Sequence, residues 1–196
     1  GVKPGDRVAI YSNTNKEWGF LDLAIMACGA TTVPVYHSSH IQEVEIILKD
    51  SSPSLLFVEN EGLYKNILSL ELEESFQKIV SIHPFLHPDS QPEFLNELVD
   101  NPEIIQALDE VSINKDDLAT IIYTSGTSGK PKGVCLTHHQ IMSAVSEVFP
   151  LLGVTDQDKT LTFLPFSHVL GRIELWGHYF CGYCIGYAQS IDKIKR

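Results

Sequence analysis

The sequence has no long apolar run that is free of charged residues. Its most apolar stretch, residues 161–188, contains Arg172, Glu174 and two histidines, a mixture that a membrane-spanning helix would not tolerate. The chain opens with Gly-Val-Lys-Pro-Gly-Asp, which lacks the apolar segment of a signal peptide. We therefore expect a cytoplasmic protein, and we expect any membrane contact to be peripheral.

Basic residues are scarce. The chain has 14 Lys and Arg against 25 Asp and Glu, which gives a formal net charge of −11. This balance argues against nucleic-acid binding, which needs a basic surface to displace counterions from phosphates. It does not exclude an anionic cofactor such as ATP, because backbone dipoles and a few lysines can dominate the local field.

Cysteine is also sparse, with four residues in the chain. Cys181 and Cys184 have the spacing of a metal or redox pair. A zinc site needs four ligands, and no second Cys pair or spaced His pair accompanies them. A redox pair would be expected at a helix N-terminus, whereas glycines and aromatic residues surround this one. We expect reduced, buried thiols.

The remaining composition is that of a globular chain, with 43% hydrophobic and 20% charged residues. Short runs of branched apolar residues alternate with segments of helical period. The expected strands cover residues 8–11, 31–35, 55–58, 79–82 and 119–124, and the expected helices cover residues 18–28, 41–49, 63–72 and 93–108. This alternation predicts an α/β fold, a doubly wound and mainly parallel sheet flanked by helices.

One further helix is marked by its ends. Thr137 and Gln140 have the spacing of a capping box, and Gly153 is a typical stop. The expected apolar stripe of this helix comprises Ile141, Ala144, Val145 and Val148. Beyond it we expect a strand over 159–164, a helix over 172–179 and a strand over 184–187. The segments 81–93, with three prolines, and 112–117 are expected to be loops.

The strongest chemical signal is the segment 123–133, which follows an expected buried strand. Its hydroxyl and glycine residues are Thr124, Ser125, Gly126, Thr127, Ser128 and Gly129, and its cations are Lys130 and Lys132. Glycines let backbone N–H groups approach anionic oxygens, and hydroxyls add charge-assisted hydrogen bonds. Pro131 excludes a continuing helix, so we expect a flexible loop that binds a polyphosphate.

Two common phosphate motifs do not match this segment. A Walker A loop would need glycine at position 124 and Ser or Thr at position 131, where the chain has Thr124 and Pro131. No G-x-G precedes a helix, as a dinucleotide fingerprint requires. A solvated surface linker remains the alternative, but ligands bind at the carboxyl ends of parallel strands, and this position favours a site.

The segment from Tyr123 to Val134 resembles the signature loop of the adenylate-forming superfamily, which includes acyl-CoA synthetases. Three other segments are similar to family motifs, namely 5–10 with Asn15 and Trp18, 29–36, and 164–169. The resemblance covers the whole chain and is closest to the long-chain fatty-acid–CoA ligases. It implies that residues 1–196 are part of an N-terminal AMP-binding domain, truncated at both ends, with the C-terminal domain absent.

The resemblance implies ATP-dependent activation of a fatty acid to acyl-AMP, followed by transfer to coenzyme A. By this similarity Thr124, Ser125, Gly126, Thr127, Ser128 and Gly129 would cradle the β- and γ-phosphates. Lys132 would supply catalytic charge as pyrophosphate leaves, and Thr124 would contact Mg²⁺. Catalysis at such a loop consists of positioning and charge stabilisation.

By the same similarity His168 would be a catalytic and substrate-binding residue beside the carboxylate and the α-phosphate. Arg172 would bind substrate at the entrance of the acyl tunnel. Long-chain members often have Phe and Glu where this chain has Leu170 and Gly171, so the chain length of the acid stays open. His138 and His139 are expected to be surface or capping residues.

Segments that the family uses for adenine, ribose and adenylation chemistry have no match in the sequence. We therefore expect this polypeptide alone to be inactive. Two alternatives remain, a different adenylate-forming ligase such as an acyl-AMP or aryl-acid ligase, and a non-catalytic phosphate-binding module. The oligomeric state is not predicted, and peripheral membrane contact of the parent protein stays open.

Overall fold

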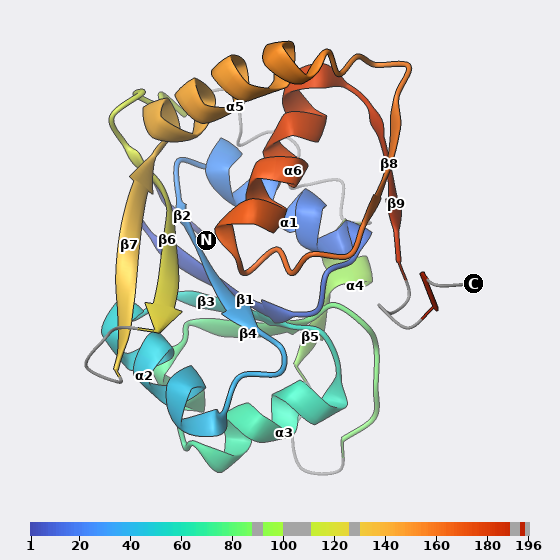
Figure 1. The fold of residues 1–196 in the computed structure, drawn as a ribbon. Coiled ribbons are helices and arrows are strands. Elements are labelled where there is room, and N and C mark those ends of the chain that lie inside the picture. The colour runs from blue at the N-terminus through green and yellow to red at the C-terminus, as the bar shows by residue number, and fades with distance from the viewer. Residues whose placement is uncertain (88–91, 100–110, 126–129, 189–192, 195–196) are drawn as a thin grey trace.

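A computed structural model describes residues 1–87, 92–99, 111–125, 130–188 and 193–194 (Figure 1). Its strands are β1 (Arg7–Ser12), β2 (Thr31–Tyr36), β3 (Leu55–Val58), β4 (Lys78–Ser81), β5 (Glu93–Phe94), β6 (Leu118–Ser125), β7 (Pro131–Thr137), β8 (Lys159–Thr162) and β9 (Cys184–Tyr187). Its helices are α1 (Lys16–Ala27), α2 (Ile41–Ser51), α3 (Glu61–Ser69), the 3₁₀ helix η1 (Glu73–Ser75), α4 (Leu95–Val99), α5 (His138–Leu152) and α6 (Val169–Cys181).

Seven strands form one sheet in the order β5-β4-β3-β1-β2-β6-β7, and β8 and β9 form a separate parallel pair. All neighbours in the large sheet are parallel except β6 and β7. The predicted α/β class and mainly parallel sheet are therefore confirmed. The carboxyl ends of β1, β2, β3 and β6 lie along one edge, where a ligand site is expected in this type of fold.

The helices cover both faces of the large sheet (Figure 1). Helices α2 and α3 pack on one face, in a cluster that includes Tyr11, Val33 and Ile67. Helices α1, α5 and α6 pack on the other face. Because both faces are covered, the central strands are apolar on both sides, and this is why they appear in the sequence as continuous runs.

Strand β7 was not predicted. The sequence suggested a flexible loop over residues 123–133, but Pro131 begins a strand that pairs antiparallel with β6 from Ser125 back to Leu118. Proline is tolerated at the first residue of an edge strand, where its missing N–H breaks no ladder. Strands β6 and β7 thus form a β-hairpin, and the predicted phosphate-loop segment covers the end of β6 and the start of β7, with residues 126–129 outside the described part of the chain.

Helix α5 has the predicted capping box, with the Thr137 hydroxyl accepting from the Gln140 N–H, and it ends at Gly153 in the left-handed conformation. Its predicted stripe was wrong at Val148, which is 42% exposed, while Phe149 is buried in its place. The helix expected over 93–108 is replaced by β5 and α4 as far as Val99, and residues 100–110 lie outside the described part.

The prediction of buried cysteines was also wrong. Cys135 and Cys184 are exposed, Cys28 and Cys181 are partly exposed, and all four are free thiols. Cys135 lies on the outer strand β7, and Cys184 begins the two-stranded sheet, so neither position is covered on both sides.

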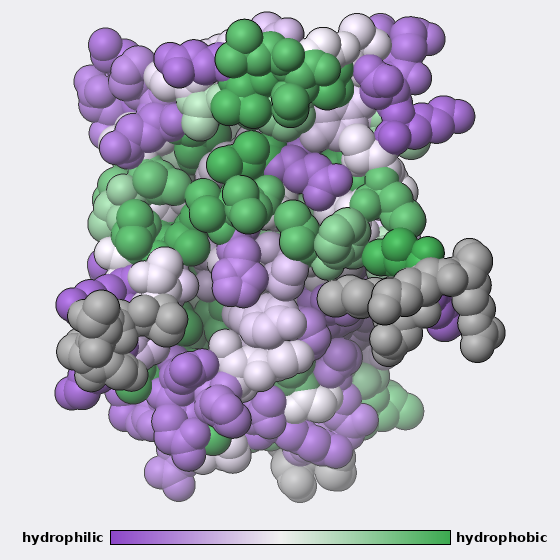
Figure 2. Space-filling model, viewed as in Figure 1, coloured by the Kyte–Doolittle hydropathy of each residue, from purple (hydrophilic) through white to green (hydrophobic). Residues whose placement is uncertain are grey.

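Apolar side chains gather on the face where α5, α6 and β8 lie (Figure 2). The large exposed residues of β8, α6 and the segment between them include Leu161, Phe163, Val169, Leu170 and Phe180. An apolar surface of this kind is typical of a contact site. No helix within the described residues is both long and apolar enough to span a membrane.

Candidate functional site

A polar pocket of about 230 Å³ lies at the carboxyl edge of the large sheet. Its lining residues are Pro34, Tyr36, Ser39, Glu43, Ile47, Tyr123, Thr124, Pro131, Ser167 and His168. Strands β2 and β6 are registered around Thr32 and Thr120, before the pocket begins. Pro34 has no N–H to donate beyond that point, so the ladder stops and leaves space between the two strand ends.

Thr124 and Lys132 face each other across the hairpin. They are directly opposed in the register of β6 and β7, and both are exposed. Side chains of directly opposed residues in an antiparallel pair lie on the same face of the sheet. The structure therefore brings a hydroxyl and an ammonium group to one side of the hairpin, beside the pocket.

The rest of the predicted phosphate loop is only partly described. Ser125 ends β6, and its side chain lies outside the described part of the chain. Gly126, Thr127, Ser128 and Gly129 lie outside the described residues altogether. Lys130 is exposed next to the start of β7.

His168 lies at the rim of the pocket, as the residue that precedes α6. Its ring centroid is 5.8 Å from that of Tyr36, and its backbone N–H donates to the carbonyl oxygen of Pro165 at 3.0 Å. The loop before it is held by Thr14, whose hydroxyl accepts from the Phe166 N–H at 3.0 Å and donates to the Leu164 oxygen at 3.2 Å. The β1–α1 connection thus fixes the segment that carries His168.

Three of the lining residues that were not predicted as site residues bring groups of chemical interest to the pocket, namely Ser167, Glu43 and Tyr36. The Ser167 hydroxyl is buried and has no hydrogen-bond partner among the described residues. Glu43 brings a carboxylate to the pocket, and Tyr36 brings its ring against His168. Tyr36 and Ser167 had a usable signal, because both lie in segments that resemble family motifs, 29–36 and 164–169. Glu43 faces the pocket through the packing of α2, which sequence periodicity does not reveal.

Tyr123 fixes the loop end of the hairpin against α2. Its hydroxyl donates to Asp50 at 2.5 Å, which joins β6 to the end of α2. Burial and the Asp50 carboxylate raise the pKa of Tyr123, so the phenol stays a neutral donor. A Cβ on Gly133 would lie 2.8 Å from Ile121 and 3.2 Å from the Tyr123 ring, which explains the glycine at this position.

Arg172 is not brought to the polar pocket. Its side chain is fully buried and forms an ion pair with Asp22. Burial lowers the pKa of Arg172 and the nearby carboxylate opposes that shift, but a guanidinium remains protonated in either case. Among the described residues no group of three or more His, Cys, Asp or Glu side chains could hold a metal ion.

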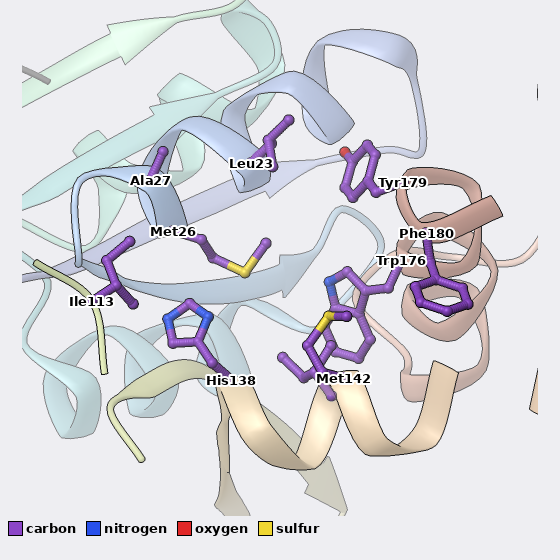
Figure 3. Close-up of a pocket in the computed structure, with 10 residues that line it drawn as sticks. Leu23, Met26, Ala27, Ile113, His138, Met142, Trp176, Tyr179 and Phe180 are labelled. Carbon is purple, nitrogen blue, oxygen red and sulfur yellow. The ribbon is translucent and has the colours of Figure 1, made fainter. Parts of the chain in front are cut away.

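A second cavity, of about 430 Å³, lies between α1, α5 and α6 (Figure 3). Its walls include Leu23, Met26, Met142 and Trp176, with His138 at one side. His138 is therefore partly buried and is not the surface residue that the sequence suggested. Burial lowers its pKa, with Asp117 and Asp22 opposing the shift. The apolar walls do not suit a polyphosphate.

Comparison with known proteins places these features in a family. A protein-family model with the description "AMP-binding enzyme" matches residues 1–196. The long-chain-fatty-acid–CoA ligase FadD15 of Mycobacterium tuberculosis is 34% identical over 205 residues, which cover 99% of this chain and 33% of that protein. The oxalate–CoA ligase of Arabidopsis thaliana is 30% identical over 174 residues, which cover 88% of this chain and 33% of that protein.

Solved structures share the fold. ATP-bound MatB from Rhodopseudomonas palustris matches with a TM-score of 0.81 at 23% identity, over 99% of this chain and 37% of that one. The chain spans about a third of the length of the curated relatives that it matches.

Proposed function

The chain belongs to the AMP-binding enzyme family, and from this premise we propose that the intact protein is a fatty acyl-CoA synthetase. The carboxylate of the acid attacks the α-phosphorus of ATP, which expels pyrophosphate and forms acyl-AMP. The thiol of coenzyme A then attacks the acyl carbon, and AMP leaves. The groups that bind adenine and ribose are assigned to the part of the relatives' length that this chain does not span.

One observation carries the proposal. Thr124 at the end of β6 and His168 at the start of α6 are far apart in the sequence but line one pocket at the carboxyl edge of the sheet. That edge is where open α/β sheets bind ligands. The name of FadD15, a long-chain-fatty-acid–CoA ligase, supports the reaction type.

Each residue of the site has a proposed role. Thr124, Ser125, Gly126, Thr127, Ser128 and Gly129 cradle the β- and γ-phosphates. Lys132, on the same side of the hairpin as Thr124, stabilises the charge that develops as pyrophosphate leaves. His168 orients the carboxylate beside the α-phosphate, and the unpartnered Ser167 hydroxyl is available to the same ligand.

The oxygen donors of the pocket fit Mg²⁺ that arrives with the nucleotide. Glu43 and Thr124 offer a carboxylate and a hydroxyl, and Mg²⁺ in such sites is held by one or two protein oxygens and by substrate phosphates. The Glu43 carboxylate would repel a bare polyphosphate, so a cation between them removes that conflict. When bound, the metal supplies charge neutralisation of the leaving pyrophosphate.

The nature of the acid is inferred from two features. Arg172 is already neutralised by Asp22, so it is not available for a second carboxylate such as that of oxalate. Val169 and Leu170, which directly follow His168, are 45% and 65% exposed and offer apolar contact to an acyl chain. Arg172 would then influence the substrate from outside the pocket.

The test is acid-dependent ATP–pyrophosphate exchange by the intact protein, with acids from acetate to stearate and with oxalate. We expect the highest kcat/KM with a long-chain acid. Lys132→Ala should lower kcat by about 10²-fold, whereas Lys159→Ala, an exposed lysine of β8, should leave it unchanged. Thr124→Val should reduce exchange and Thr124→Ser should retain most of it.

Two outcomes would contradict the proposal. Exchange with oxalate but with no monocarboxylic acid would indicate a different ligase of the family. Absence of exchange with every acid, together with retained ATP binding, would indicate a phosphate-binding module without catalysis.

A further inference from the structure

A charge pair is buried between α1 and α6. Arg172 and Asp22 are both 0% exposed, and Nη2 of Arg172 lies 2.7 Å from Oδ1 of Asp22. The guanidinium carbon is 4.9 Å from the ring centroid of Trp18 and 4.6 Å from that of Trp176. Two aromatic rings thus hold the planar cation, in a geometry that favours cation–π attraction.

Hydrogen bonds join this pair to the sheet. Nη1 of Arg172 donates to the Thr120 hydroxyl at 3.3 Å, and that hydroxyl donates to the Thr32 carbonyl oxygen at 2.8 Å. The second carboxylate oxygen of Asp22 accepts from the Trp176 indole at 3.3 Å. The network therefore connects β2, β6, α1 and α6.

Three of these elements carry residues of the polar pocket. Thr124 lies further along β6 than Thr120, and Tyr36 lies further along β2 than Thr32. In the first turn of α6, the backbone N–H of Arg172 donates to the carbonyl oxygen of His168 at 3.0 Å. A change in the network would therefore move the pocket residues relative to one another.

Trp18 extends the network to the loop that leads to His168. It packs edge-on against Phe166, with ring centroids 5.4 Å apart. The same ring covers Arg172. The loop and the helix that meet at His168 are thus both held by α1.

Stability alone does not account for such a pair. Two charges taken out of water lose hydration that their mutual attraction only partly restores, and well-packed apolar residues of similar volume are often as stable. The charge pair adds a fixed relative orientation, because the planar guanidinium donates its hydrogen bonds in set directions and so permits few arrangements of its partners. A directional support suits a site whose groups must keep a fixed separation.

We infer that Arg172 is a positioning residue, which together with Asp22 sets the place of His168 relative to Thr124. The inference rests on the proposed function, in which these two residues act on the acid and on the phosphates of ATP. It replaces direct substrate binding by Arg172 with an action through α6.

The central test compares single and double variants of the intact protein. Arg172→Met leaves a buried carboxylate unpaired and Asp22→Asn leaves a buried cation unpaired, so each should lower the melting temperature by several degrees. The double variant removes both charges at nearly constant volume and should recover most of that loss. Its kcat for exchange should nevertheless fall by about 10- to 100-fold, because a small misplacement of a reacting group has such an effect.

A milder pair of variants covers the case in which the double variant does not fold. Thr120→Val removes the hydroxyl that accepts from Arg172 and keeps the side-chain shape, whereas Thr120→Ser keeps the hydroxyl. We expect Thr120→Val to lower kcat several-fold and to lower the melting temperature less than either charge variant does, and Thr120→Ser to resemble the wild type. A double variant or a Thr120→Val variant that folds and retains wild-type kcat would overturn the inference.

A readout that does not need turnover separates this inference from the proposed function. Crystal structures of the wild-type and double-variant proteins should show the His168 ring displaced relative to Thr124 by about 1 Å. An unmoved ring would contradict the positioning role. Absence of exchange in the wild type would contradict the proposed function and leave the structural comparison to decide on positioning.

Discussion

Gly171 lies in α6 at the point where the helix meets the loop that carries His168. A Cβ at this position would overlap the carbonyl oxygen of Pro165 and would lie 3.1 Å from that of Leu164. Both atoms belong to backbone, which cannot rotate away as the end of a side chain could. Gly171→Ala should therefore displace the loop.

Two effects of Gly171→Ala oppose each other. Alanine is more favourable than glycine within a helix by about 1 kcal/mol, whereas an overpacked side chain costs about 1–3 kcal/mol. We expect the free energy of unfolding to fall by the difference, about 0–2 kcal/mol. Activity is the more sensitive readout, because a loop shift of about 1 Å would lower turnover by about 10²-fold.

The assay combines thermal unfolding with ATP–pyrophosphate exchange on the intact protein. Gly62→Ala is the matched control, since its new Cβ in α3 would meet only the Asn60 side-chain oxygen, at 3.3 Å. That variant should be at least as stable as the wild type and fully active. If Gly171→Ala behaves in the same way, the contact with the Pro165 carbonyl does not constrain the loop, and the explanation for glycine at this position is wrong.

Four other predictions concern the fold and the chain. Gly177→Ala should destabilise the protein because its Cβ would overlap the Phe149 ring. In the double variant, Phe149→Leu should relieve part of that loss. Additive effects of the two substitutions on thermal unfolding would refute the predicted clash between them. Gly133→Ala should lower kcat by displacing the Tyr123 ring, and unchanged kinetics would argue against this. The pKa of His138 is lowered in the folded state, so the unfolded chain takes up a proton first as the pH falls below 6.5. The free energy of unfolding should therefore fall from pH 7.5 to pH 5, and it should fall less in His138→Gln. An equal dependence on pH in the two proteins would contradict the burial effect. The 196-residue chain alone should show no exchange, and measurable exchange would refute this.

The fold was predicted well where the signals were local. Strands β3 and β9 were predicted with the observed bounds, since each is a short apolar run between turn-forming residues. Helix α5 was predicted from its capping box. Strand β7 was missed because its residues have no alternating pattern and are extended only through their pairing with β6.

The candidate site was predictable to a similar extent. Thr124 and His168 belong to recognisable motifs, and the structure brings both to one pocket. The environment of Arg172 was not predictable, because Asp22, its partner, is 150 residues away in the sequence. Long-range pairing of single side chains leaves no periodic trace, so sequence analysis could assign this arginine only by resemblance.

The seam where β2 pairs with β6 has a consequence for how the protein folds. Its side-chain hydrogen bonds run from Thr31 to Leu118 and from Thr120 to Thr32. Their sequence separations are 87 and 88 positions. Closing so long a segment is entropically unfavourable, and folds rich in such contacts form slowly. Tyr36 and Thr124 lie on opposite sides of the seam, so a chain still emerging from the ribosome has no polar pocket until these two distant strands have met.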